Sequence, residues 1–279
     1  MTFYSEALKL NRNTFTILRD LIQERTGLFF EENKADILAD KLSPLVIERG
    51  FGNFLDYYYL LKYDENARDE WGKVVNALTV QETFFWREID QIRCLAEVLV
   101  PRWFADHEGE TLRIWSAACA TGEEPLSIAM ALEQKGYFNR WPIGIFASDI
   151  SPAAVARARE GIYRERAFRN LPEELRERYF IREGDRWRVD ADLHRRVSWG
   201  TVNLLDETQA ALPARSPVIF CRNVFIYFTA PTIRKVVRMF YERMPAPGYL
   251  FVAASESLLK VSTDFALKEI GGAFVYTKS

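Results

Sequence analysis

The sequence predicts an α/β fold: a doubly wound, largely parallel sheet with an antiparallel last strand pair, a small antiparallel β flap inserted into it, and an amino-terminal all-α bundle. Three observations lead to this prediction. The stretch from Leu112 to Leu132 changes from a strand pattern to a helical pattern across a run of small residues. Buried strand patterns then alternate with helical ones as far as a final hairpin. The first 78 residues, in contrast, contain amphipathic helical segments and no strand pattern.

The composition excludes several classes of protein. The 279 residues carry 37 Lys and Arg against 39 Asp and Glu, so no general attraction to nucleic acid or to an anionic membrane is expected. The sequence contains no run of about 18 apolar residues, which is the length that could span a bilayer. Residues 1–13 lack the apolar core of a signal peptide. The distant cysteines Cys94, Cys119 and Cys221 favour a reducing cytoplasm. With only His107 and His194 beside them, no metal site can be assembled from the spacing.

Domain boundaries follow from the change of pattern along the chain. Residues 1–78 contain four segments with one apolar face each, which predicts a small helical domain. Residues 79–110 are expected to form a linker and a connecting helix that carry part of the functional site. Residues 111–279 are expected to form the sheet domain, with the flap at about 179–199.

The linker contains an unusual arrangement of side chains. Gln81, Glu82 and Thr83 precede three consecutive aromatic residues, and Arg87 follows them directly. The rings are expected to be core that joins the bundle to the next domain. A guanidinium beside aromatic rings at such a junction is suited to hold a carboxylate by a forked pair of hydrogen bonds.

The turn between the first strand and the first helix of the sheet domain is a candidate ligand site. Residues 116–122 have small side chains, so the backbone can turn tightly and a ligand can lie against it. Only Gly122 is glycine, which disfavours a dinucleotide with its pyrophosphate. Glu123 and Glu124 open the helix, where acidic groups suit the positive end of its dipole. A simple strand-to-helix connection with acidic capping remains the alternative.

Two further polar residues follow strands of the predicted sheet. Asp149 ends the second strand, where a carboxylate usually binds the hydroxyls of a ribose; capping of the next helix is the alternative. Asn203, followed by Leu204, offers an amide and an apolar side chain for an adenine ring. Asn203 could equally cap the turn in which it lies.

The last third of the sequence completes the sheet. Short strand patterns at 179–181, 186–189 and 197–199, with a turn signal at 183–185, predict the antiparallel flap. Pro217 to Phe220 reads as a buried parallel strand whose end, Cys221-Arg222-Asn223, would face a ligand crevice. Two more apolar segments separated by Gly271-Gly272 predict the closing hairpin.

Five pieces of the sequence, in this order and at these distances, resemble a known family: LTVQETFFWRE, WSAACATGEEPLSIAM, ASDISPAAVARAREGIY, NLLD and IFCRNVFIYF. They are similar to the chemotaxis receptor methyltransferases of the CheR type. The resemblance covers nearly the whole chain. It implies a Rossmann-like methyltransferase sheet, S-adenosylmethionine as methyl donor, and S-adenosylhomocysteine as product. The implied acceptors are glutamate side chains in the cytoplasmic domain of a methyl-accepting chemotaxis receptor.

The resemblance also implies roles for single residues. The implied cofactor contacts are Gln81, Thr83, Arg87, Glu124, Asp149, Asn203, Leu204, Cys221 and Arg222. Glu124 is the better of the two adjacent glutamates for the ammonium of the methionine part. Arg87 and Tyr227 are the implied residues of the methyl-transfer step, with Tyr227 beside the reactive methyl group.

The expected chemistry needs no general base and no metal. A sulfonium methyl is already activated, and a glutamate with a pKa of about 4.3 is an anion at neutral pH. The protein must align oxygen, carbon and sulfur and remove water from the carboxylate. We expect a cytoplasmic monomer that inserts into no membrane and binds no nucleic acid. Because the turn within residues 181–187 looks shorter than in relatives that bind a receptor-tail pentapeptide, we expect methylation without such tethering. A noncatalytic adaptor of the same fold that binds the same cofactor is the alternative function.

Overall fold

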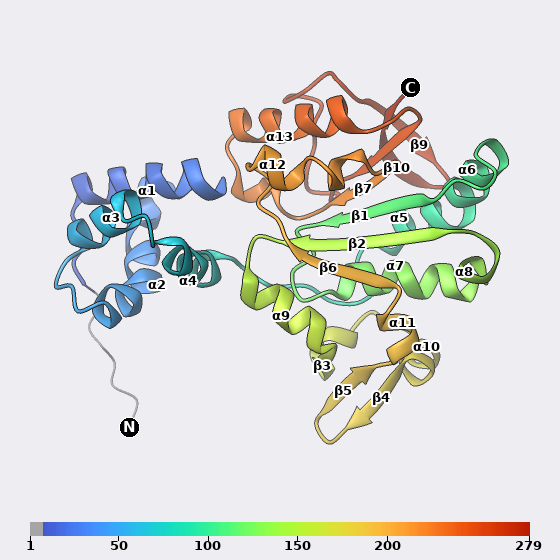
Figure 1. The fold of residues 1–279 in the computed structure, drawn as a ribbon, viewed down its shortest axis with the longest axis horizontal. Helices are drawn as coiled ribbons and strands as arrows, with labels where there is room; N and C mark the ends of the chain where they lie inside the picture. Colours follow the sequence, from blue (N-terminus) through green and yellow to red (C-terminus); the bar gives the residue numbers. More distant parts are fainter. Residues whose placement is uncertain (1–7) are drawn as a thin grey trace. The chain divides into compact units, whose positions relative to one another are not determined.

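The computed structural model of the chain describes residues 8–279 (Figure 1). Residues 1–7 lie outside the described residues. They are the first part of the predicted helical domain (1–78) and of the segment predicted to lack a signal-peptide core (1–13). The chain forms two compact units. The helical unit comprises the chain up to Val80 together with Tyr227–Thr229, and the sheet unit comprises Gln81–Ile226 and Ala230–Ser279.

The helical unit is a bundle built on one apolar cluster. Its core includes Phe15, Leu18, Leu42, Tyr57 and Val74, each at most 2% exposed. Amphipathic helices bury their apolar faces against one another in this cluster. The elements are α1 (Arg12–Thr26), a 3₁₀ turn (Glu32–Lys34), α2 (Ala35–Glu48), α3 (Phe54–Tyr63) and α4 (Arg68–Leu78).

A distant segment packs into this bundle at the end of α1. Gly27 ends the helix in the left-handed region with φ of 81°, and a Cβ there would lie 2.7 Å from the ring of Phe228. The N–H of Phe29 donates to the carbonyl of Tyr227 at 3.0 Å, and the Gln23 side chain donates to the Thr229 hydroxyl at 3.2 Å. The sequence did not indicate that residues 227–229 belong to the bundle.

The main sheet of the sheet unit has seven strands in the order β6-β2-β1-β7-β8-β10-β9. Strands β6, β2, β1, β7 and β8 pair in parallel, while β10 is antiparallel to both β8 and β9. This confirms the doubly wound sheet with an antiparallel last pair. In chain order the strands are β1 (Leu112–Ala117), β2 (Ile143–Asp149), β6 (Val197–Thr201), β7 (Val218–Cys221), β8 (Gly248–Phe251), β9 (Ala266–Ile270) and β10 (Ala273–Lys278).

Alternate residues of β1 join the cores on the two faces of the sheet. Leu112 and Ile114 belong to the cluster that contains Leu126 of α7 (Glu123–Gln134). Trp115 points the other way and packs edge-on against Phe240 of α13 (Ala230–Arg243), with ring centres 5.5 Å apart. Successive side chains of a strand point to opposite faces, so β1 is buried on both sides as a central parallel strand should be.

The flap differs from the prediction in one strand. The second sheet has the order β3-β5-β4, formed by β3 (Ile162–Arg164), β5 (Arg186–Val189) and β4 (Phe180–Glu183). The segment at 197–199, predicted as a flap strand, is instead β6, which pairs in parallel with β2. The predicted flap boundary of 199 is therefore wrong, because local alternation does not reveal which sheet a strand joins.

The remaining elements connect the strands. The linker leads into a continuous helical stretch of α5 (Ile89–Cys94), a π-helical turn (Leu95–Leu99) and α6 (Val100–Asp106). The shorter elements are α8 (Tyr137–Arg140), α9 (Pro152–Glu160), α10 (Glu173–Tyr179), α11 (Ala191–His194), α12 (Glu207–Ala210) and the 3₁₀ turns Glu165–Phe168, Pro213–Arg215 and Phe225–Tyr227.

Candidate functional site

Three neighbouring parallel strands end at one edge of the sheet. The last residues of β1 and β7, Ala117 and Cys221, are paired, and β2 ends at Asp149 on the other side of β1. Open parallel sheets bind ligands outside the carboxyl ends of their strands. The loops that follow these three strands therefore form the candidate site.

The loop after β1 has a strained backbone. Ala118 and Ala120 have positive φ values of 61° and 48°, and Gly122 follows with 99°. Left-handed alanines cost about 1–2 kcal/mol each. The loop is held by the N–H of Cys119, which donates to the carbonyl of Ser148 at 2.9 Å. Such strain persists only where the surroundings fix it, and it is typical of binding sites.

Asp149 fixes this loop to the end of β2. Its Oδ2 accepts the N–H of Ala120 at 2.9 Å and its Oδ1 accepts the N–H of Ser151 at 2.8 Å. The alternative role as a helix cap falls to Ser151, whose hydroxyl accepts the N–H of Ala154 at the start of α9. Burial raises the pKa of Asp149, which is 7% exposed, and the backbone N–H groups of Ser151, Ala120 and Ile150 oppose that rise.

Glu124 and Arg222 form a largely buried ion pair beside the same loop. Arg222 Nη1 lies 3.3 Å from Glu124 Oε2, and Arg222 Nη2 lies 3.2 Å from Glu88 Oε2. Ser116 donates to Glu124 Oε1 at 2.7 Å. Burial raises the pKa of Glu124, whereas the Arg222 charge and the Ser116 hydrogen bond lower it. The sequence prediction missed Glu88 and Ser116.

The linker carries Gln81, Thr83 and Arg87 past this network. Gln81 donates to the Ser151 hydroxyl at 3.0 Å, and the carbonyl of Arg87 accepts Arg222 Nη2 at 2.7 Å. The Arg87 guanidinium lies 5.5 Å from the centre of the Phe84 ring, and its charge lowers the pKa of Glu124. Thr83 is half-buried in the same irregular stretch.

The linker is strained where it meets the network. Trp86 and Glu88 have positive φ values of 66° and 48°. Phe85 is fully buried and stacks on Phe168 with ring centres 5.2 Å apart, which confirms that at least this aromatic residue is core. The N–H of Trp86 donates to the Ser127 hydroxyl at 3.1 Å, which attaches the linker to α7.

Asn203 and Leu204 lie in the turn that follows β6. Asn203 Oδ1 accepts the N–H of Leu205 at 3.0 Å, so this side chain does cap its turn. The N–H of Val202 donates to the carbonyl of Asp149 at 3.1 Å, which holds the turn against the end of β2. Leu204 is 7% exposed. The proposed adenine contacts of Asn203 and Leu204 stay a prediction.

Cys221 and Tyr227 differ in their surroundings. Cys221 is fully buried, and this burial raises the pKa of its thiol well above the usual value, so it contributes no thiolate at neutral pH. Tyr227 belongs to the helical unit, where it packs on the core cluster. Its predicted place beside the methyl group stays a prediction.

A carboxylate that the sequence did not single out holds the loop after β7. Glu256 is 7% exposed, and its oxygens accept the N–H groups of Asn223 and Phe225 at 2.8 and 2.7 Å. Asn223 is also left-handed, with φ of 60°. Glu256 lies between two serines in no recognisable motif, so the sequence did not indicate this role.

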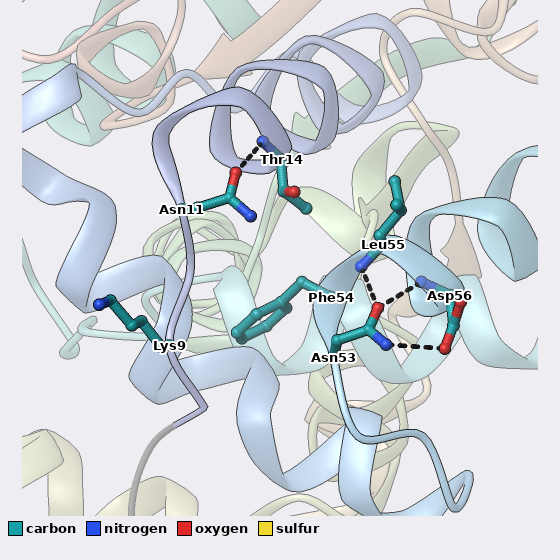
Figure 2. A pocket seen from close by; sticks show the side chains of 7 residues that line it. All are labelled: Lys9, Asn11, Thr14, Asn53, Phe54, Leu55 and Asp56. Atoms are coloured by element: carbon teal, nitrogen blue, oxygen red, sulfur yellow. Dashed lines mark hydrogen bonds between the residues drawn. The ribbon is translucent and has the colours of Figure 1, made fainter.

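A separate cavity of about 230 Å³ lies in the helical unit between the starts of α1 and α3 (Figure 2). Asn11 accepts the N–H of Thr14, and Asn53 accepts those of Leu55 and Asp56. The cavity therefore lies between two capped helix ends. None of the predicted site residues lines it.

Residues 8–279 contain neither a metal-binding cluster nor a membrane-spanning helix. No group of three or more His, Cys, Asp or Glu is arranged to hold a metal ion there. No helix in the same range has the length and apolar character needed to cross a bilayer.

Comparisons with known proteins agree with this arrangement. Residues 81–272 match the family model of the CheR methyltransferase SAM binding domain, and residues 13–79 match that of the CheR methyltransferase all-alpha domain. Chemotaxis protein methyltransferase 2 of Vibrio cholerae is 33% identical over 95% of this chain and 92% of its own length. The chemotaxis protein methyltransferases of Escherichia coli and Salmonella typhimurium are 34% and 36% identical, over 99% of this chain and 94% and 93% of their own lengths.

Proposed function

The chain belongs to the CheR methyltransferase family, and on this premise we propose that it methylates glutamate side chains of a methyl-accepting chemotaxis receptor. It is an S-adenosylmethionine-dependent methyltransferase. The observation that supports the proposed site best is the convergence of Asp149, Glu124 and Arg222 at three adjacent parallel strand ends.

The residues at this edge suit S-adenosylmethionine. A carboxylate has about four acceptor positions, so Asp149 can bind a ribose hydroxyl in addition to the backbone N–H groups that it accepts. Arg222 Nε is buried without a hydrogen-bond partner among residues 8–279. Buried polar groups are normally paired, and a ligand carboxylate would supply such a partner. Glu124 offers an anion to the ammonium of the methionine part.

When bound, S-adenosylmethionine supplies a sulfonium-activated methyl group, which passes to a glutamate carboxylate to give a methyl ester and S-adenosylhomocysteine. Asp149 holds the ribose in this proposal, and Asn203 and Leu204 contact the adenine. Arg87 orients the incoming carboxylate or the carboxylate of the cofactor. Tyr227 shapes the methyl-transfer slot. These side chains act by alignment and by exclusion of water, because the acceptor is already ionised.

A labelling assay separates this enzyme from the noncatalytic adaptor. The protein is incubated with methyl-labelled S-adenosylmethionine and cytoplasmic fragments of candidate receptors. We expect label that is released by base, as a carboxyl methyl ester requires. Cofactor binding without transfer to any fragment would support the adaptor, and base-stable label would contradict ester formation.

Arg87→Ala tests the role of the linker arginine. We expect a fall in ester formation or in cofactor affinity of at least about tenfold, because a charge-assisted pair contributes about 1.5–3 kcal/mol. Arg93→Ala is the matched control, since Arg93 lies on the helix that follows and is 59% exposed. Unchanged turnover and unchanged affinity in isothermal titration would remove Arg87 from the site.

We also propose that methylation needs no pentapeptide tether. The flap strands β4 and β5 are joined by Gly184 and Asp185 alone. A micromolar complex with a free receptor-tail pentapeptide would contradict this. A cytoplasmic monomer is expected, which cell fractionation and the molar mass in solution can test.

A further inference from the structure

Glu256 lies in the loop after β8 and binds backbone from two loops at once. Oε1 accepts the N–H groups of Phe225 and Ile226 at 2.7 and 3.3 Å. Oε2 accepts those of Asn223 and Ala253 at 2.8 and 2.9 Å. Four donors occupy about the full acceptor capacity of one carboxylate. The side chain therefore acts as a junction between the loop after β7 and the loop after β8.

The negative charge of Glu256 is balanced by these backbone dipoles. Within residues 8–279 no Lys, Arg or His nitrogen comes within ion-pair distance of it, although the residue is only 7% exposed. Charged acceptors bind N–H groups more strongly than neutral ones do. A buried anion without a cation is stabilised only where its hydrogen-bond donors are held in place. The loop N–H groups therefore stabilise the carboxylate, and the carboxylate in turn holds the loop.

A second carboxylate ties the same region to the linker. Glu88 Oε2 accepts the N–H of Ala254 at 3.2 Å and pairs with Arg222 at 3.2 Å. Arg222 is thus held by Glu88 and Glu124, before the chain reaches the four residues 223–226. The anchor of those four residues is Glu256, whose donors include Asn223 in its left-handed conformation.

We propose that Glu256 is a positioning residue for methyl transfer: its carboxylate fixes residues 223–226, the segment that leads directly into Tyr227. This inference rests on the proposed function, in which Tyr227 shapes the methyl-transfer slot. Because Cys221 is paired within the sheet and Arg222 has its own partners, the loss of Glu256 affects turnover more than cofactor affinity.

Glu256→Gln tests this with nearly unchanged shape. The new amide NH₂ faces two backbone N–H groups that the carboxylate oxygen had accepted, so two hydrogen bonds are lost whichever way the amide turns. We expect kcat, expressed per S-adenosylhomocysteine binding site measured by titration, to fall by about tenfold or more. The dissociation constant of S-adenosylhomocysteine should change by less than about threefold. An unchanged kcat per binding site would overturn the proposal.

Hydrogen exchange decides the matter even if the wild type methylates no receptor fragment. In Glu256→Gln the amides of Asn223, Phe225 and Ile226 should lose protection, while those of residues 116–124 keep it. Unchanged protection at the three amides would overturn the proposal. Absence of methylation by the wild type would instead contradict the proposed function, so the two failures are distinguishable.

Two variants complete the design. Glu256→Asp keeps the charge on a shorter side chain and should retain more turnover than Glu256→Gln. If Glu256→Gln folds poorly, the turnover of Glu256→Asp is compared with that of the wild type in its place. Glu70→Gln is the matched control, because Glu70 is likewise a buried carboxylate but lies in the helical unit. It should lower Tm and leave kcat per binding site unchanged. A loss of turnover in the control as large as in Glu256→Gln would show that the effect is only one of stability, and would overturn the proposal.

Discussion

The two units use buried carboxylates in different ways. In the helical unit, Glu70 is fully buried and is neutralised by Arg49 at 2.6 Å, while Tyr57 donates to its other oxygen at 2.7 Å. In the sheet unit, Asp149 and Glu256 are held by backbone N–H groups. The first arrangement pairs a charge with a charge and stabilises the bundle. The second leaves part of the acceptor capacity of Asp149 open near the strand ends and uses that of Glu256 to hold two loops together.

Backbone strain divides between the units in the same way. Among residues 8–279, the non-glycine residues with positive φ are Trp86, Glu88, Ala118, Ala120 and Asn223. All five lie in the linker or in the loops after β1 and β7, and none lies in the helical unit. The sheet unit therefore bears conformational cost where the proposed cofactor would bind, whereas the helical unit is built for stability.

The largest expected effect on stability is in the helical unit. Glu70→Ala removes the acceptor of buried Tyr57 and the partner of Arg49. The Arg49 side chain is 41% exposed and can be hydrated, but the hydroxyl of Tyr57 is left buried without its acceptor, so the free energy of unfolding should fall by about 2–3 kcal/mol. Denaturant titration measures this, and S-adenosylhomocysteine affinity should be unchanged. A loss below about 1 kcal/mol would mean that the pair is not a stabilising feature.

Asp149→Asn should have the largest effect on ligand binding. The change halves the anionic acceptor capacity that the ribose hydroxyls need, and each charge-assisted hydrogen bond contributes about 1.5–3 kcal/mol. We expect S-adenosylhomocysteine to bind about 100-fold more weakly in isothermal titration. Asp90→Asn, at a residue whose side chain is 73% exposed, is the control. Equal affinity of the wild type and Asp149→Asn would contradict the ribose role.

Glu123, a buried carboxyl of the sheet unit, makes folding stability depend on pH. Burial raises its pKa from 4.5 to about 7, against the opposing hydrogen bond from Thr121. The folded state therefore keeps the proton up to about pH 7, whereas the unfolded state loses it near 4.5, so folding stability falls as the pH rises between these values. Glu123→Gln should be more stable than the wild type at pH 8, by about 2 kcal/mol, and the gain should vanish near pH 4. A constant difference at both pH values would contradict this.

Ala120→Gly probes the strain directly and should have the smallest effect. Glycine adopts positive φ without penalty, so the free energy of unfolding should rise by up to about 1 kcal/mol. Loss of preorganisation should weaken S-adenosylhomocysteine binding a few-fold. Ala131→Gly, inside α7, should instead lower stability by about 1 kcal/mol. A decrease in both variants would mean that the loop is not strained.

Helices and strands that depend on a local pattern of residues are predictable from this sequence. The change of period at 112–132 gave β1 and α7, and Gly271-Gly272 gave the hairpin of β9 and β10. Pairing between distant segments is not predictable in this way: residues 197–199 alternate like a flap strand, yet β6 extends the main sheet beside β2. Glu88 and Glu256 were missed because their partners are backbone N–H groups and an arginine far along the chain, which no spacing reveals.

A crystal structure of the protein with S-adenosylhomocysteine tests the central claim most directly. The strained edge should hold the nucleoside with its ribose hydroxyls within hydrogen-bond distance of Asp149, and its amino-acid part beside Glu124 and Arg222. A sugar far from Asp149, or a nucleoside bound elsewhere on the chain, would contradict the account.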